Sequence, residues 1–289
     1  MIKLILSDMD GTLMPFGNEH VSQRTLEAIT SLLDAGIFFG PSSGREPHDL
    51  LARFHGDERC VATGIYGNGK VIYIGGERVF QLTLDADELD RLVATLHDID
   101  GCFFTFYNSQ TAGEQNATTD PAKLFSFVDM SERDRELASK DALVKLPRES
   151  LPAIPRGLAI TTGAVFCSGD KAHIEEVRTI LEAACPGFDF VLPGNNVFDV
   201  LPKGWTKVSA LPVLERELGI TREQIVYIGD SENDLTMLEE IPHSFCVANG
   251  TAAAQAAARW IIDADVDDAP AQLMEELAQS GGRMPERFC

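Results

Sequence analysis

Residues 2–12 read Ile-Lys-Leu-Ile-Leu-Ser-Asp-Met-Asp-Gly-Thr, and this stretch decides the fold. Its first half is a short apolar run, which is typical of a buried strand, and the Gly-Thr pair predicts a turn directly after it. Asp8 and Asp10 therefore lie at the carboxyl end of a strand, where open α/β sheets place their ligands. Two carboxylates beside a core are costly unless a cation or a reaction uses them, so we interpret the stretch as part of an active site.

A simpler interpretation competes with this one. Aspartates after strands often only accept hydrogen bonds from free backbone N–H groups, as turn residues or helix caps. A calcium loop of the EF-hand type is excluded, because it needs glycine at its sixth position, whereas Gly11 is the fourth residue counted from Asp8. The choice between a turn and an active site depends on the rest of the chain.

Composition narrows the class of protein. A length of 289 residues predicts one large or two modest domains, and 44% hydrophobic residues supply a sizeable core. The net charge of 24 − 45 = −21 argues against nucleic acid or an anionic membrane as a partner. Six cysteines without a Cys-x-x-Cys pair favour reduced thiols over a disulfide framework or a zinc site. No apolar run has the length of a membrane span or a signal peptide, so we expect a cytoplasmic protein.

The order of the expected elements indicates two domains. Strands and helices alternate over residues 1–83 and again over 195–289, which predicts a doubly wound, Rossmann-like α/β core with a parallel sheet. The pattern is interrupted over 84–194, which we expect to be an inserted α+β domain. Within it, the polar stretch 108–130 is long enough to be a functional loop.

A second acidic cluster follows another apolar run. Residues 225–228 read Ile-Val-Tyr-Ile, and residues 229–234 read Gly-Asp-Ser-Glu-Asn-Asp. An ordinary capped helix start would also explain this pattern. In a parallel sheet, however, both strand ends point the same way, so Asp8, Asp10, Asp230 and Asp234 are expected to converge. Such an all-oxygen set suits a hard cation such as Mg2+ and argues against zinc.

Two further segments suit a phosphate group. Ser43 and Gly44 follow an apolar run and offer a hydroxyl and free N–H groups at an expected helix start, although a routine serine cap would look the same. Lys207 is expected just inside another helix start, where its charge opposes the helix dipole, so an anion or a carboxylate nearby would explain it. The alternative for Lys207 is a solvated surface lysine.

Taken in order, these segments resemble the haloacid dehalogenase superfamily, and within it the Cof-like phosphatases. The resemblance covers about 1–83 and 195–265. It rests on these segments: Asp8-Met9-Asp10-Gly11-Thr12-Leu13, Ser43-Gly44-Arg45, Asn68-Gly69, Lys207 in a Gly-x-x-Lys pattern, Gly229-Asp230-Ser231-Glu232-Asn233-Asp234, and Val247-Ala248-Asn249-Gly250. One segment departs from the family pattern, because residues 262–270 lack its Asn-rich, Asp-Gly-Val stretch.

The resemblance implies roles in catalysis. Asp8 is expected to be the nucleophile, to form an aspartyl-phosphate and to bind Mg2+. Asp10 is expected to protonate the leaving oxygen and then to activate water, while its backbone carbonyl binds the metal. Lys207 is expected to neutralise Asp8 and the phosphate. This concentration of positive charge would offset the acidic field of the chain at the site.

The resemblance also implies binding roles. Ser43 and the amide of Gly44, with Lys207, are expected to hold the phosphoryl group, and Asp230 to complete the metal site. Further matching residues are expected to support these groups: Arg45, Asn233 and Asp234. The inserted domain 84–194 would be a cap that selects the substrate.

The resulting functional hypothesis is a Mg2+-dependent phosphatase of small phosphate esters, with sugar phosphates as the first expectation. Two alternatives share the same motifs. A phosphomutase would use the same aspartyl-phosphate and return the phosphoryl group to substrate. A non-catalytic phosphate sensor would be expected to lack Asp8 or Asp10, and both are present.

Overall fold

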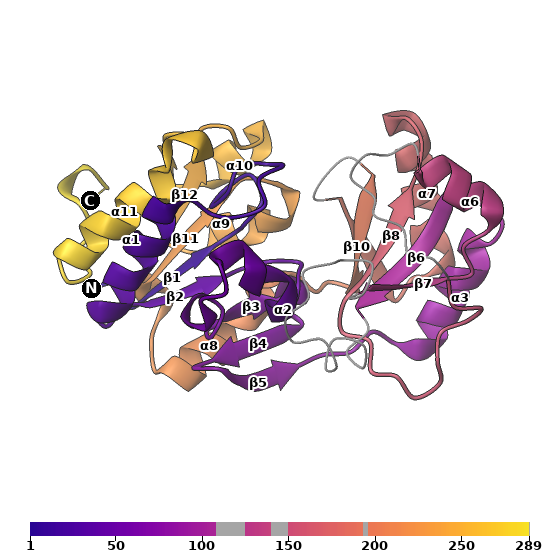
Figure 1. Ribbon diagram of the computed structural model, residues 1–289, viewed down its shortest axis with the longest axis horizontal. Coiled ribbons are helices and arrows are strands. Elements are labelled where there is room, and N and C mark those ends of the chain that lie inside the picture. Colours follow the sequence, from indigo (N-terminus) through magenta and orange to yellow (C-terminus); the bar gives the residue numbers. More distant parts are fainter. Residues whose placement is uncertain (108–124, 140–149, 193–195, 289) are drawn as a thin grey trace. The chain divides into compact units, whose positions relative to one another are not determined.

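The computed structural model describes residues 1–107, 125–139, 150–192 and 196–288. The chain forms two compact units (Figure 1): the first unit comprises Met1–Gln81 with Thr206–Cys289, and the second unit comprises Leu82–Trp205. The strands of the first unit are β1 (Leu4–Ser7), β2 (Phe38–Pro41), β3 (Gly64–Tyr66), β4 (Val71–Ile74), β5 (Glu77–Gln81), β11 (Ile225–Gly229), β12 (His243–Val247) and β13 (Trp260–Ile262). Its helices include α1 (Gln23–Asp34), α2 (Pro47–Leu51), α8 (Leu211–Leu218), α9 (Leu235–Glu240), α10 (Ala252–Ala257) and α11 (Ala269–Gln279).

The first unit is a doubly wound α/β sheet, as the sequence predicts. Its main sheet has the order β13-β12-β11-β1-β2, and every neighbouring pair is parallel. Alternate residues of β1 pack on opposite faces, because strand side chains alternate in direction. Ile5 packs with α1 and α11, which lie side by side, whereas Leu4 and Leu6 pack with α8, α9 and α10. Strand β1 is therefore buried on both faces.

A second, smaller sheet flanks this core. Strands β3, β4 and β5 form an antiparallel meander, and Gly75 and Gly76 make the tight turn between β4 and β5. Ile65 of β3 and Ile72 of β4 pack in the same hydrophobic cluster as Leu4 and Leu6.

The second unit is an α+β fold around an antiparallel sheet of order β7-β6-β8-β10-β9. One face packs against α3 and α7 through Leu92 and Val177, and the other packs against α6 through Ala138. The strands are β6 (Cys102–Tyr107), β7 (Phe125–Val128), β8 (Gly163–Cys167), β9 (Phe188–Val191) and β10 (Val197–Pro202). The helices that pack on them are α3 (Ala86–Leu96), α6 (Glu132–Ala138) and α7 (Lys171–Ala184).

Three details differ from the expectations drawn from sequence. Strand β10, which we assigned to the core from residue 195 on, pairs with β8 and β9 and lies in the second unit, which ends at Trp205. Much of the expected loop 108–130 lies outside the described residues, but its end forms β7. Helix α6 had no counterpart in the prediction.

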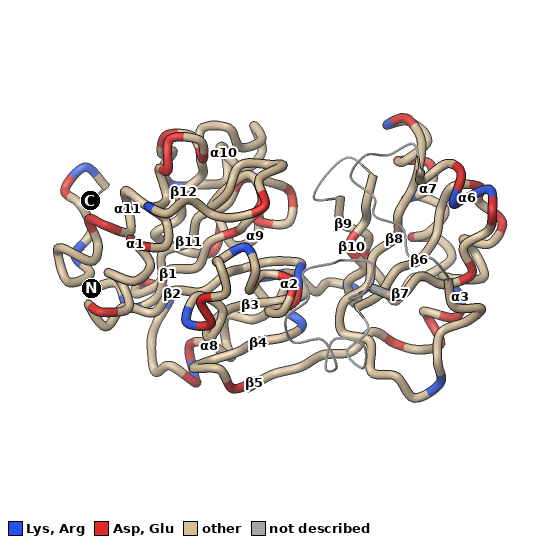
Figure 2. The backbone as a smooth tube through the Cα atoms, in the orientation of Figure 1, with Lys and Arg blue, Asp and Glu red and all other residues tan. Residues whose placement is uncertain are grey.

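Acidic residues are spread over both units (Figure 2), and the net charge of the chain is −21. Any binding of an anion therefore needs a local source of positive charge. None of the helices that the structure describes has the length and apolar character to cross a bilayer.

Candidate active site

The carboxyl ends of β1 and β11 bring three aspartates together. Ser7 pairs with Ile228 at the end of the ladder, and the backbone N–H of Asp8 donates to the carbonyl of Ile228 at 2.9 Å. Carboxylate oxygens of Asp8, Asp230 and Asp234 all lie within 4.8 Å of one another, and all three residues are buried. The parallel register thus produces the convergence that the sequence predicts for these three acids.

Lys207 supplies the positive charge of this cluster. Its Nζ donates to Oδ1 of Asp8 and to Oδ1 of Asp234, each at 2.6 Å, and its side chain is 0% exposed. Burial lowers the pKa of Lys207, but the charges of Asp234 and Asp8 outweigh that effect and hold it well above its usual value. Lys207 is therefore a buried ammonium group and not the solvated surface lysine of the alternative interpretation.

Asp234 has every carboxylate position occupied. Its Oδ1 accepts from Lys207 and, at 2.6 Å, from the hydroxyl of Tyr227, while its Oδ2 accepts from the backbone N–H groups of Asp230 and Ser231. Asp234 therefore fixes Lys207 and the turn after β11. Tyr227 was absent from the predicted site, because its place inside an apolar strand suggested only a core residue.

Among the described residues, the carboxylate of Asp230 accepts a hydrogen bond through one of its oxygens. Its Oδ1 accepts from the hydroxyl of Thr12 at 2.7 Å, a second contact that was not predicted. Burial and the neighbouring charge of Asp234 raise the pKa of Asp230 to about 7, partly opposed by the Thr12 hydrogen bond. Burial also raises the pKa of Asp8 well above its usual value, although Lys207 opposes this. Asp230 thus needs further positive charge to be fully ionised near neutral pH.

This arrangement fits a divalent cation. Among the described residues, Oδ2 of Asp8 and Oδ2 of Asp230 accept no hydrogen bond, and three buried carboxylates face a single lysine. Oxygen donors and uncompensated negative charge are what a hard divalent cation requires. Asp8 and Asp230 would hold it, whereas the four hydrogen bonds on Asp234 leave that residue as a support.

The carboxylate of Asp10 has other partners than the acidic cluster, namely two arginines. Its carboxylate accepts from Nε of Arg45 at 3.0 Å and lies 3.6 Å from a guanidinium nitrogen of Arg53. Arg45 also donates to Asp49 at 2.8 Å, so it is anchored on a buried acid. Arg45 was predicted as a supporting residue, whereas Arg53, which lies beyond the Ser43-Gly44-Arg45 motif, was not.

The segment after β2 carries Ser43 and Gly44, but it does not start a helix there. Helix α2 begins at Pro47, close to the expected start, so Ser43 and Gly44 lie in the turn before the helix and do not supply its first N–H groups. The Ser43 hydroxyl accepts from the backbone N–H of Arg45 at 3.2 Å. Ser43 is buried and Gly44 is half-buried in this turn.

Two asparagines connect further motifs. Nδ2 of Asn233 donates to Oδ1 of Asn68 at 3.4 Å, which links the turn after β11 to the loop before β4. Asn249 donates to the carbonyl of Gly11 at 2.7 Å, and its Oδ1 accepts from the backbone N–H of Asp265. The segment 262–270, which departs from the family pattern, is thus linked through Asn249 to the turn that carries Asp10.

Comparison with known proteins agrees with this geometry. The sequence model of the haloacid dehalogenase-like hydrolase family matches residues 5–274 of this chain. A 5-amino-6-(5-phospho-D-ribitylamino)uracil phosphatase of Bacillus subtilis (strain 168) is 26% identical over 299 positions, covering 96% of this chain and 98% of that protein. An HMP-PP phosphatase of Escherichia coli O6:H1 is 27% identical over 252 positions, covering 86% of this chain and 85% of that protein.

Solved structures show the same fold. A sugar phosphatase of HAD subclass IIB has a TM-score of 0.75 at 18% identity, covering 95% of this chain and 98% of the other. A phosphoryl-transfer enzyme studied for its trigonal-bipyramidal intermediate has a TM-score of 0.76 at 19% identity. With the family match spanning both parts of the first unit, the chain belongs to the haloacid dehalogenase-like hydrolases, as a Cof-like phosphatase.

Proposed function

We propose that this phosphatase hydrolyses small phosphorylated metabolites, with sugar phosphates as the leading class, through an aspartyl-phosphate on Asp8 and with Mg2+ as its cation. The observation that carries the proposal is that the two carboxylate oxygens of Asp8 differ in their hydrogen bonds. Its Oδ1 is bound by Lys207, whereas its Oδ2 accepts no hydrogen bond among the described residues. Oδ2 is therefore free to attack, and Lys207 fixes its direction.

In the first step, Oδ2 of Asp8 forms a bond to phosphorus as the bond between phosphorus and the ester oxygen breaks. The protonated carboxyl of Asp10 gives its proton to the leaving oxygen. Arg45 and Arg53 contact this carboxyl group outside the acidic cluster and fix its position at the site. A water then attacks the phosphorus, Asp10 takes its proton, and Asp8 is released with inorganic phosphate.

The charges of the site favour this path. Lys207 stays protonated, since the neighbouring acids raise its pKa, and it neutralises charge on Asp8 and on the phosphoryl oxygens. Mg2+ held by Asp8 and Asp230, with the backbone carbonyl of Asp10, would supply charge neutralisation for the phosphoryl oxygens. Ser43 and Gly44 would hold the remaining phosphoryl oxygens.

Specificity is assigned to the second unit. Residues 82–205 form a separate α+β fold inserted between the two halves of the core, which is the place of a cap in the chain. The relatives act on substrates that their names describe as ribitylamino-uracil phosphates, HMP-PP and sugar phosphates. We therefore propose a small phosphorylated metabolite as substrate.

A screen of phosphorylated metabolites with Mg2+, read as inorganic phosphate, tests the activity. Asp8→Asn should abolish turnover and leave the fold intact, while Asp34→Asn, an exposed change at the end of α1, should leave turnover unchanged. Phosphate release that survives in Asp8→Asn contradicts the mechanism. A phosphoryl group that returns to a substrate hydroxyl without release of phosphate would instead show a phosphomutase.

A further inference from the structure

Two cysteines of the second unit face each other across its sheet. Cys102 begins β6, Cys167 ends β8, and the two are register partners. The backbone N–H of Ser168 donates to the carbonyl of Gly101 at 3.0 Å, so the cysteines form a non-hydrogen-bonded pair, the arrangement that brings facing side chains closest. Their sulfur atoms are 3.0 Å apart. The pair has no Cys-x-x-Cys spacing in the sequence, because the pairing of β6 with β8 brings the two cysteines together.

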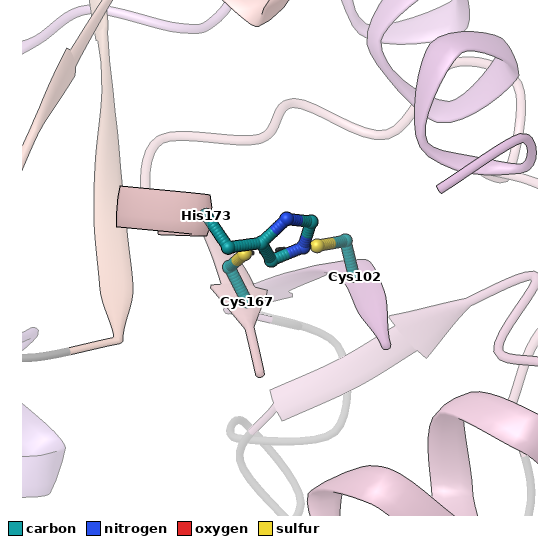
Figure 3. A group of neighbouring side chains, drawn as sticks. All are labelled: Cys102, Cys167 and His173. Carbon is teal, nitrogen blue, oxygen red and sulfur yellow. Dashed lines mark hydrogen bonds between the residues drawn. The ribbon is translucent and has the colours of Figure 1, made fainter. Parts of the chain in front are cut away.

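His173 adds a third donor beside the two sulfurs (Figure 3). It lies in the first turn of α7, where its backbone N–H donates to Oδ1 of Asp170 at 2.9 Å. Gly169 has φ +152°, and a Cβ there would lie 2.7 Å from Cδ2 of the histidine ring. The ring position therefore depends on a glycine and on a helix cap. A nitrogen of the ring and both sulfurs lie within 4.8 Å of one another.

We propose that Cys102, Cys167 and His173 form a binding site for a thiophilic divalent cation of the zinc type. Two thiolates and an imidazole are ligands that zinc prefers, and three protein ligands with one open position recur in zinc sites. With a Zn–S bond of about 2.3 Å, two sulfurs on one tetrahedral zinc lie ~3.8 Å apart. The observed pair therefore has to open by less than about 1 Å, which small side-chain rotations supply.

Charge and burial agree with this occupant. Cys102 and Cys167 are 2% and 0% exposed, so their thiolates need a compensating charge. Binding of the cation displaces one proton from each thiol, and a divalent ion with two thiolates is neutral overall. The Cys102 thiol donates to the Cys167 sulfur, so the two sulfurs already face each other where the cation would bind.

The site is open to solvent on the side of His173. Its side chain is 39% exposed, so solvent reaches the ring and can supply the cation and a water ligand. Its Nδ1 lies 3.9 Å from Oε2 of Glu176, which is beyond hydrogen-bond distance. A small rotation that closes this gap would let the carboxylate orient a ligating histidine. Asp134, which is also close, is not a fourth ligand, because its two oxygens accept from the backbone N–H groups of Gly101 and Ser131.

A disulfide between Cys102 and Cys167 is the competing occupant of this position. It would form by loss of two electrons and two protons to an oxidant such as a peroxide, and it would give His173 no part in the bond. The placed imidazole therefore favours the cation. The site also differs in ligand chemistry from the acidic cluster of the first unit, which offers only oxygen, so one protein can hold two different ions.

Titration with Co2+, a spectroscopic substitute for Zn2+, tests the site without using phosphatase activity. The full chain is reduced with a phosphine under anaerobic conditions, and excess Mg2+ saturates the acidic cluster. We expect one equivalent of Co2+ to give a thiolate-to-cobalt charge-transfer band that Zn2+ then removes. An oxygen-only site gives no such band, so the acidic cluster does not contribute.

Variants assign the band to its ligands. Cys167→Ser should lose it, and Cys102→Ala should lose it as well, whereas Cys185→Ser, at a buried cysteine that ends α7 in the same unit, should keep it. Glu176→Gln should weaken cation affinity about 10-fold, and His173→Gln should weaken it further. Circular dichroism before metal addition shows that each variant is folded.

Three results would overturn the site. The first is a reduced protein that gives no thiolate band at saturating Co2+. The second is a band that persists in folded Cys167→Ser, or an affinity unchanged in His173→Gln. The third is purified protein that contains no zinc-type metal and whose peptide map shows a Cys102–Cys167 disulfide, which would assign the pair to redox chemistry instead.

Discussion

The hydroxyl of Tyr227 donates a 2.6 Å hydrogen bond to Oδ1 of Asp234, the same oxygen that accepts from Lys207. We expect Tyr227→Phe to lower the free energy of unfolding by about 1 kcal/mol, because Lys207 remains as a partner for that oxygen. Because Asp234 then holds Lys207 less firmly, we expect kcat/KM to fall by at most about 5-fold. Urea unfolding and steady-state kinetics measure the two effects.

Tyr66→Phe is the matched control for that change. Tyr66 is also buried in the first unit, but its hydroxyl donates to the carbonyl of Val61. It should cost similar stability and leave kcat/KM unchanged. Equal kinetic losses in the two variants would show that Tyr227 acts only through general stability.

Gly11 and Gly17 separate backbone strain from crowding at the site. Both have a left-handed φ, +84° and +88°, but a Cβ on Gly11 would lie 2.9 Å from Oδ2 of Asp230 and would also collide with Phe16, whereas a Cβ on Gly17 meets nothing within 4 Å. Both alanine variants should lose about 1 kcal/mol from strain. Only Gly11→Ala should also raise the Mg2+ concentration needed for half-maximal activity. The same metal requirement in both variants would contradict the crowding argument.

Arg45 positions Asp10, and a lysine cannot replace it. The guanidinium of Arg45 contacts Asp10 and Asp49 together, at 2.9 and 2.8 Å, which needs the planar fork of arginine. We expect Arg45→Lys to lower kcat by about 10-fold, which corresponds to about 1.4 kcal/mol in the barrier. Arg24→Lys, which alters an exposed bidentate pair with Glu275, should leave kcat unchanged. A wild-type kcat in Arg45→Lys would remove the positioning role.

The raised pKa of Asp230 predicts how stability depends on pH in chelated protein. Between the usual value of 3.8 and about 7, the folded carboxyl keeps a proton that the unfolded chain releases, so the free energy of unfolding falls as pH rises through this window. The loss should amount to a few kcal/mol at most. Urea unfolding with EDTA at several pH values measures it.

Asp230→Asn tests the origin of that fall. The amide does not ionise, so the slope should become shallower, although the raised pKa of Asp8 contributes in the same direction. Mg2+ should restore stability above pH 7 in the wild type, because it binds the folded state only. A slope unchanged in Asp230→Asn would assign the pH dependence to other groups.

The sequence predicted the parts of the site that depend on strand ends. Asp8 and Asp230 lie at the ends of apolar runs, and a parallel sheet brings such ends together, so their meeting follows from local pattern and topology. Tyr227 and Arg53 were missed for a different reason. Their partners, Asp234 and Asp10, are reached only in three dimensions, and neither residue type breaks the pattern of its own segment.

The same limit on prediction from local sequence patterns applies to the fold. Which sheet β10 joins depends on its pairing with β8 and β9, which no local pattern states. The Cys102–Cys167 pair is likewise a product of the register between β6 and β8. Local elements were therefore predictable, whereas partners across elements required the assembled sheet.

The position of β1 between β2 and β11 has a consequence for folding during synthesis on the ribosome. All strands of the second unit precede β11 in the chain, so that unit can complete its sheet while the centre of the first unit still lacks a neighbour. Until β11 emerges, β1 has an open edge and Asp8 has neither Asp230 nor Asp234 beside it. The second unit can therefore be complete before the main sheet of the first unit is, because the whole second unit separates β1 from its partner β11 in the chain.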